Sequence, residues 1–154
     1  YEISLGLVGS EMCIRDSFWT EDADIIIACM GSTAGTVRHV IRELRKEGEK
    51  IGLVRIRSFR PFPYQDLAEV LTRAKAVAVL DRSVDMGAQG APLFVEIRSA
   101  LYDCDERPMV FDYIYGLGGR DMPVDLVKAM IKDVKEAMRE KRPPFIKKYW
   151  GVRE

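Results

Sequence analysis

Little in this sequence suits catalysis or metal binding by cysteine and histidine. The chain has one histidine, His39, and three cysteines, Cys13, Cys29 and Cys104, which lie far apart and form no CxxC pair. Closely spaced cysteine pairs are typical of zinc sites and iron–sulfur clusters, so this spacing argues against a metal site and against a disulfide framework. Cys29 lies in an apolar run and is predicted to be a small core residue.

The sequence also lacks a charge excess and a long apolar run. Lysine plus arginine and aspartate plus glutamate are equal at 24 each, so the chain has no basic surplus for a nucleic-acid backbone. No apolar run approaches the roughly 18 residues of a membrane span, and the opening segment lacks the basic start of a secretion signal. We therefore expect a cytoplasmic protein with neither nucleic acid nor membrane as a partner.

The opening segment, residues 1–17 (YEISLGLVGSEMCIRDS), fits no regular element. The stretch LGLVGSEMCIRDS resembles translated sequencing-adapter readthrough, which occurs at the broken ends of genes assembled from fragmentary DNA. We expect a non-native segment and exclude it from functional argument. The alternative is a natural edge strand over residues 3–8. There is no initiating Met, so the natural chain is expected to extend upstream.

Four strand-like runs alternate with four amphipathic stretches in the rest of the chain. The runs are residues 23–30, 50–59, 76–80 and 109–115, and the second of them alternates between apolar and basic residues. After the first run, apolar residues recur at helical spacing from Val37 to Leu44, and Gly48 ends the helix. Strand followed by helix, repeated four times, predicts a mainly parallel sheet with helices on both faces.

The composition of the runs predicts the order of the strands. Strands covered on both faces are apolar throughout, so the first and third runs belong in the centre. The second run has Arg55 and Arg57 and the fourth has Asp112, so both belong outside. The prediction is a three-layer α/β/α domain over residues 18–142 with strand order 2-1-3-4, followed by a tail over residues 143–154.

In such a sheet a crevice opens at the carboxyl ends of strands 1 and 3, and ligands bind there. The loop GSTAG, residues 31–35, and the loop 81–90 border it. GSTAG places backbone N–H groups at a helix N-terminus, where they can hold an anion. A helix capped by Ser32 or Thr33 explains the same pattern.

Charged residues near this crevice are interpreted as contacts rather than as catalytic groups. Arg57, Arg60 and Arg82 are expected to gather there with Asp81 and to form salt bridges with a neighbouring domain. His39 falls opposite the apolar stripe of its helix and is expected to face solvent. No pair of nucleophile and base is visible, so we expect neither a catalytic residue nor a metal ligand.

Two later segments are expected to contact another domain or subunit. The loop GLGGRD, residues 116–121, has three glycines before an Arg-Asp pair, which indicates close backbone approach or positive φ. Purely local turn chemistry is the alternative. The tail holds Phe145, Tyr149 and Trp150 and has no core of its own to enter, so these side chains are expected to dock onto a neighbour.

Five segments, taken in order, resemble one enzyme family. They are ADIIIACMGS, GLVRIRSFRPFP, VAVLDRS followed by Gly87 and Gly90, YIYGLGGRD, and YWGVR. Together they resemble the C-terminal part of the α subunit of 2-oxoacid:ferredoxin oxidoreductases, most closely pyruvate:ferredoxin oxidoreductase. The resemblance implies the transketolase C-terminal fold, which agrees with the predicted strand order. That fold has an additional antiparallel strand before the first parallel one, and here its sequence is missing or replaced by residues 1–17.

The resemblance implies an enzyme that decarboxylates a 2-oxoacid on thiamine diphosphate, forms an acyl-CoA and passes electrons through iron–sulfur clusters to ferredoxin. GLGGRD favours pyruvate as the 2-oxoacid. The fragment alone is expected to bind none of these cofactors. A diphosphate-binding β subunit, a γ subunit and a ferredoxin-like δ subunit are the implied partners, and this domain would serve their assembly around the active site.

We expect ten residues at an interface or at the border of the active site. They are Gly31, Ser32, Thr33, Arg60, Asp81, Arg82, Gly118, Gly119, Arg120 and Asp121. Two other interpretations stay open. One is a freestanding α/β module that binds an anion or nucleotide in the crevice, and the other is the equivalent domain of another transketolase-like enzyme.

Overall fold

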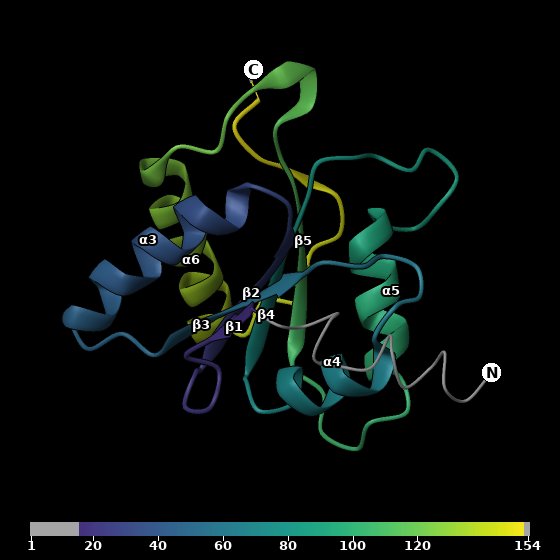
Figure 1. Cartoon of the computed structure of the whole chain (residues 1–154), viewed down its shortest axis with the longest axis horizontal. Helices are drawn as coiled ribbons and strands as arrows, with labels where there is room; N and C mark the ends of the chain where they lie inside the picture. Colours follow the sequence, from purple (N-terminus) through teal and green to yellow (C-terminus); the bar gives the residue numbers. More distant parts are fainter. Residues whose placement is uncertain (1–15, 153–154) are drawn as a thin grey trace.

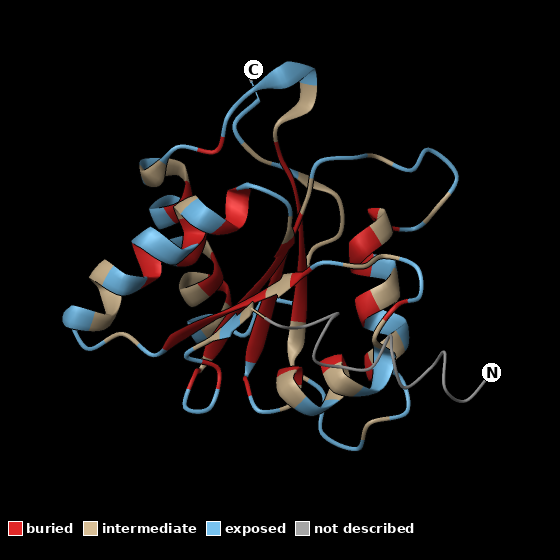
Figure 2. Ribbon diagram, in the orientation of Figure 1, coloured by how far each residue is buried: buried red, intermediate tan, exposed pale blue. Residues whose placement is uncertain are grey.

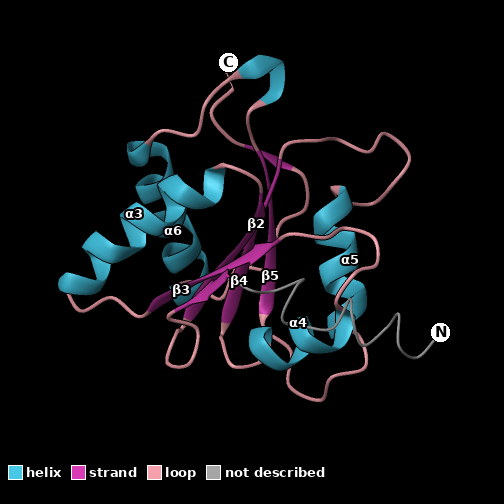
Figure 3. Ribbon diagram, viewed as in Figure 1, coloured by secondary structure: helices cyan, strands magenta, loops and turns pink. Residues whose placement is uncertain are grey.

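Six strands form one sheet between two layers of helices in a computed structural model that describes residues 16–152 (Figures 1 and 3). The strands are β1 (Asp16–Phe18), β2 (Ile25–Met30), β3 (Ile51–Ile56), β4 (Ala76–Asp81), β5 (Met109–Ile114) and β6 (Lys148–Tyr149). The helices are α3 (Thr33–Lys46), α4 (Tyr64–Leu71), α5 (Pro92–Leu101) and α6 (Val124–Arg139), with a 3-10 turn, η1 (Leu117–Gly119).

The strand order is β1-β3-β2-β4-β5-β6. Strands β2, β3, β4 and β5 are parallel to their neighbours among these four, which confirms the predicted order 2-1-3-4. At one edge β1 runs antiparallel to β3, with Ser17 opposite Val54. This is the additional antiparallel strand that the resemblance implies. It includes Asp16 and Ser17, so the regular structure begins two residues before position 18. The alternative strand over residues 3–8 lies outside the described residues.

The two helical layers cover opposite faces of the sheet. Helices α3 and α6 pack on one face, and α4 and α5 on the other (Figure 1). The central strands β2 and β4 are buried along almost their whole length (Figure 2), because helices cover them on both sides. Cys29 in β2 is completely buried, as predicted, and burial raises the pKa of its thiol to about 12. His39 on α3 is exposed, also as predicted.

Asp112 on β5 is a buried residue, not the mark of an exposed edge. Strand β5 lies outside β4, as predicted, but the Asp112 side chain is 0% exposed. Its Oδ2 atom accepts hydrogen bonds from the backbone N–H groups of Ala91, 3.1 Å away, and Lys147, 3.0 Å away. A polar residue in an apolar run therefore need not indicate an exposed edge strand. It can also be a buried acceptor for backbone N–H groups of neighbouring loops.

The tail packs on its own domain, whereas the sequence predicts that its aromatic residues dock onto a neighbour. Strand β6 continues the sheet beyond β5 in parallel orientation. The rings of Phe145 and Trp150 have their centroids 5.0 and 5.3 Å from that of Tyr113. Tyr149 stays exposed. The open side of β5 and the adjoining α6 supply the apolar surface, which the sequence pattern alone does not reveal.

Candidate functional site

A polar pocket of about 200 Å³ lies at the carboxyl ends of the strands, where the sheet order reverses between β2 and β4. It is lined by Ser32, Thr33, Thr36, Arg82, Tyr115, Arg120, Asp121 and Met122. Five of these were predicted as site residues. Thr36, Tyr115 and Met122 were missed, although Tyr115 directly follows a buried strand, and residues in that place point to the same crevice.

The floor of the pocket joins the start of α3, after β2, to the residue that follows β5. The Thr33 and Tyr115 hydroxyl oxygens are 2.6 Å apart, and both side chains are buried. The Tyr115 N–H donates to the Asp81 carbonyl, 2.9 Å away, which fixes the chain as it leaves β5. Burial raises the pKa of Tyr115, while the hydrogen bond with Thr33 opposes that shift. The phenol therefore stays protonated and serves as a neutral hydrogen-bonding group.

The start of α3 forms one wall of the pocket. Gly31 has φ +74°, which turns the chain sharply after β2. Ser32 occupies the N-cap position with φ −70° and ψ −26°, and neither it nor another side chain makes a capping bond. Ser32 therefore occupies the predicted cap position but makes no side-chain capping bond, and the Thr33 hydroxyl binds Tyr115. The first turn of α3 also has no acidic residue.

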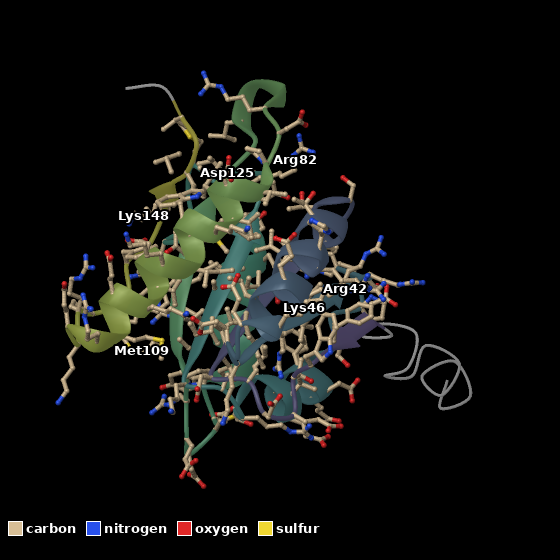
Figure 4. All side chains as sticks on the ribbon, turned by 90° about the vertical axis from the view of Figure 1, so that its left-hand side faces the viewer. Arg42, Lys46, Arg82, Met109, Asp125 and Lys148 are labelled. Atoms are coloured by element: carbon tan, nitrogen blue, oxygen red, sulfur yellow. The ribbon has the colours of Figure 1, made fainter. Side chains whose placement is uncertain are left out.

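Arg82 forms the opposite wall, and packing on the backbone positions it. Its guanidinium carbon is 5.9 Å from the centroid of the Tyr115 ring. Gly116 has φ +69°, and a Cβ there would lie 2.8 Å from Nε of Arg82. The side chain rests where only glycine leaves room for it. Figure 4 shows Arg82 at the end of the domain where α6 begins, far from Met109 at the start of β5.

The glycine loop supplies the third wall through Arg120 and Asp121. Gly118 and Gly119 have φ values of +70° and +77°, as predicted from the three glycines, but a Cβ at either position would meet nothing within 4 Å. Close approach therefore occurs at Gly116 and not at these two. Nη1 of Arg120 donates to the Gly151 carbonyl, 2.9 Å away, which links this loop to the tail.

Asp81, a predicted site residue, is not among the residues that line the pocket, and its side chain contacts the start of α5. Its Oδ2 atom accepts from the Leu93 N–H at 2.6 Å, and its Oδ1 atom accepts from Oγ of Ser83 at 3.3 Å. Burial raises the pKa of Asp81, and the nearby Asp112 carboxylate adds to the shift. Both carboxylates meet the start of α5, where negative charge is favourable. The side chain of Asp81 thus has a structural role.

The predicted cluster of Arg57, Arg60 and Arg82 does not form. Arg60 pairs with Glu96 of α5 at 2.7 Å, and Arg57 pairs with Asp16 of β1 at 2.8 Å. Of the three arginines, only Arg82 lines the pocket. The sequence placed all three near one crevice because each follows a strand, but different strands and loops direct them to different faces.

The residues of this chain do not fit an iron–sulfur cluster. Such clusters are held by four cysteine thiolates, or by two cysteines and two histidines. The sequence has three cysteines and one histidine, and Cys29 is buried within the sheet. Within residues 16–152 no three His, Cys, Asp or Glu side chains gather in a way that would hold a metal ion. In the same range, no helix has the length and apolar character to cross a membrane.

The fold and the polar crevice at its switch point define a transketolase-like α/β domain. A split-gene transketolase has a similar structure, with a TM-score of 0.56 and 16% sequence identity over 82% of this chain and 42% of that one. A 2-oxoglutarate:ferredoxin oxidoreductase from Magnetococcus marinus gives a TM-score of 0.53 and 22% identity over 75% of this chain and 18% of that one. At these identities the likeness concerns the fold alone.

The sequence relatives are more specific. Residues 23–127 match the family model described as pyruvate:ferredoxin oxidoreductase core domain II, and the chain belongs to this family. The ketoisovalerate oxidoreductase subunit VorA of Pyrococcus horikoshii is 47% identical over 120 residues, which cover 78% of this chain and 30% of the relative. The pyruvate synthase subunit PorA of Thermotoga maritima is 42% identical over 146 residues, covering 95% and 36%. The chain thus spans about a third of these relatives.

Proposed function

We propose that this chain is part of the α subunit of a thiamine diphosphate-dependent 2-oxoacid:ferredoxin oxidoreductase, which decarboxylates its substrate to an acyl-CoA. The observation that carries the proposal is the match of residues 23–127 to core domain II, together with 42–47% identity to PorA and VorA subunits. Because the chain spans only about a third of those relatives, the activity is proposed for the whole enzyme and not for this domain.

Within that enzyme the domain serves assembly around the active site. Its pocket holds exposed arginines and hydroxyl groups but no pair of nucleophile and base among the lining residues. Arg82 and Arg120 are suited to carboxylates of a neighbouring domain, since guanidinium groups form bidentate pairs with them. Asp121, Gly118 and Gly119 belong to the same proposed contact surface, with Gly31, Ser32 and Thr33 beside it.

The proposed partners are a diphosphate-binding β subunit, a γ subunit and a ferredoxin-like δ subunit, with ferredoxin as the electron acceptor of the whole complex. Thiamine diphosphate, iron–sulfur clusters and CoA belong to other parts of that complex. A cytoplasmic location is part of the same proposal. Relatives named for pyruvate and for ketoisovalerate both match, so these names do not select the 2-oxoacid. Pyruvate is proposed from GLGGRD alone.

A domain exchange tests the proposal directly. Residues 18–152 of this chain would replace the matching region of Thermotoga maritima PorA, produced together with the other subunits of that enzyme. The chimera should assemble and should reduce ferredoxin when given pyruvate and CoA, whereas PorA without this region should not assemble. In the matching VorA chimera the preferred 2-oxoacid should follow the host, because the substrate contacts lie outside this domain.

Two substitutions in the chimera separate the contact surface from general stability. Arg82→Ala should lower the fraction of assembled complex, since Arg82 lines the exposed pocket. Arg73→Ala is the matched control, because Arg73 is an exposed arginine that pairs with Glu69 within one turn of the same segment. Failure of both chimeras to assemble, under conditions where both parent enzymes do, would refute the proposal.

The freestanding binding module remains the second candidate, and the polar pocket at the switch point favours it. Isothermal titration calorimetry of the purified chain with inorganic phosphate distinguishes the binding module from the assembly domain. Micromolar binding that Arg82→Ala abolishes would support an independent binding site. Absence of binding in the isolated chain would leave assembly as the function of this surface.

A further inference from the structure

Lys147 joins the tail to the loop that connects β4 and α5. Its Nζ atom donates to the carbonyl oxygens of Asp85, 2.9 Å away, and Ala88, 2.6 Å away. Its backbone N–H donates to Oδ2 of Asp112 at 3.0 Å. Lys147 has φ +54°, an uncommon conformation for a residue with a side chain, and this conformation accompanies all three contacts.

The same carboxylate holds the far end of the loop. Oδ2 of Asp112 also accepts from the N–H of Ala91, 3.1 Å away, at the residue that precedes α5. A Cβ at Gly90 would lie 2.3 Å from the Phe94 ring and 3.2 Å from this oxygen, so glycine allows the loop to pass close to both. The loop is thus attached at its middle by Lys147 and at its end by Asp112. Val84 packs against the core near the start of the loop, whereas Met86, between the two carbonyl groups that Lys147 binds, is 92% exposed.

The next residue, Lys148, anchors the tail on the other side of the sheet. Its Nζ atom donates to Oδ2 of Asp133 on α6 at 2.6 Å and lies 4.4 Å from the centroid of the Phe145 ring. Figure 4 shows Lys148 beside α6. Docking of the tail on α6 therefore does not depend on Lys147. Lys148 thus holds the tail on α6, and Lys147 holds the loop.

We propose that the tail is a strap that fixes the conformation of the β4–α5 loop, with Lys147 as its clamp. The loop begins at Arg82, which lines the polar pocket, and the tail also accepts a hydrogen bond from Arg120 through the Gly151 carbonyl. The strap therefore couples the edge of the sheet to two walls of the pocket. A partner that displaces the tail from β5 releases the loop, and a partner that holds the loop strengthens the docking of the tail, because such coupling is reciprocal.

Backbone relaxation of ¹⁵N in the 154-residue chain tests this device. In the wild type, order parameters of residues 85–88 should lie near the roughly 0.85 of rigid backbone, and Lys147→Met should lower them below about 0.6. Exchange of the Ala91 amide proton should become about tenfold faster, since an ammonium-to-carbonyl bond is among the stronger hydrogen bonds. Lys148→Met, the matched control, should leave the loop rigid and should loosen residues 145–150 instead.

Three results would overturn the proposal. The first is a loop that is already flexible in the wild type. The second is a loop whose order parameters are the same in Lys147→Met and the wild type. The third is a rise in amide exchange in Lys147→Met that is equally large in β2 and β4, because Lys147 would then support the whole fold and not the loop.

Discussion

The hydroxyl groups of Thr33 and Tyr115 lie 2.6 Å apart, although 82 residues separate them in the sequence. Thr33 begins α3 directly after the β2 turn, and Tyr115 follows β5, so this one contact joins the two sides of the switch-point crevice. The pair is buried, and it engages the Thr33 hydroxyl, which would otherwise be available as a hydrogen-bonding group at the start of α3. It thereby determines which polar groups the floor of the pocket offers to a partner.

Tyr115→Phe should lower the free energy of unfolding by about 1–2 kcal/mol, because it leaves the buried Thr33 hydroxyl without its partner. Thr33→Val should cost a similar amount for the converse reason. The double variant should cost less than the sum of the two, since it removes both partners at once. Urea denaturation of the four proteins measures the coupling. Strictly additive costs would show that the short contact contributes nothing to stability.

Asp112→Asn tests how the buried carboxyl responds to pH. Oδ1 of Asp112 is buried and has no hydrogen-bond partner among the described residues, and desolvation by burial raises the pKa of Asp112 above the ordinary 3.8. The charged groups that face it are Asp81 and Lys147, and Lys147 opposes the shift.

A raised folded-state pKa means that the folded chain holds this proton more tightly than the unfolded chain does. The contribution to stability is therefore fully present below the unfolded pKa and is lost as pH rises through the folded pKa. The free energy of unfolding of the wild type, minus that of Asp112→Asn, should fall as pH rises above the unfolded pKa of about 4. Asp81 is present in both proteins, but the Asp112 carboxylate adds to its raised pKa, so the substitution changes Asp81 as well, and this change acts in the same direction. A difference that rises with pH would mean that Lys147 and the two N–H donors outweigh burial.

The sheet was predictable because its centre has a strong signal. Strands covered on both faces must be apolar throughout, and β2 and β4 satisfy this rule without exception at their central positions. The same rule gives the wrong reason for the polarity of Asp112, since polarity alone does not distinguish an exposed edge strand from a buried hydrogen-bond acceptor. Strand β6 has two residues, one of them Lys148, and carries no apolar run. It exists because β5 offers an unpaired edge, which is a property of the finished sheet.

The pocket was predictable as far as topology determines it. Knowing that the carboxyl ends of parallel strands meet at one edge brings Ser32, Arg82 and Arg120 together without any side-chain detail. The position of Arg60 depends on its ion pair with Glu96 of α5, a contact between a loop and a helix that no periodicity encodes. Likewise the clamp formed by Lys147 depends on where the tail returns to the sheet.

Two glycines of the same loop allow strain and crowding to be separated. Gly116→Ala and Gly118→Ala both place a side chain at φ near +70°, and this alone should cost about 1–2 kcal/mol of unfolding free energy. Only at Gly116 would the new Cβ lie 2.8 Å from Nε of Arg82. Gly116→Ala should therefore cost more than Gly118→Ala, and Arg82→Ala combined with it should reduce the excess, leaving the 3.1 Å approach of the new Cβ to the Arg120 carbonyl oxygen. Thermal or urea denaturation measures all three, and equal costs at Gly116 and Gly118 would show that Arg82 moves away freely.

The aromatic residues of the tail provide the last test, which asks whether the tail belongs to this domain. The Trp150 ring contacts Tyr113, and its Nε1 atom donates to the Leu126 carbonyl at 3.0 Å. Trp150→Ala should lower the free energy of unfolding by about 2 kcal/mol, less than the 3–5 of a fully buried aromatic residue because Trp150 is partly exposed.

Tyr149→Ala is the matched control, since Tyr149 is the exposed aromatic residue directly before Trp150, and its cost should stay within about 0.5 kcal/mol. If both variants instead unfold at the wild-type urea concentration, Trp150 contributes nothing to the isolated domain. Its value would then lie in an interface with another subunit, as the sequence first indicated. The assembly of the PorA chimera carrying Trp150→Ala would show which subunit loses that contact.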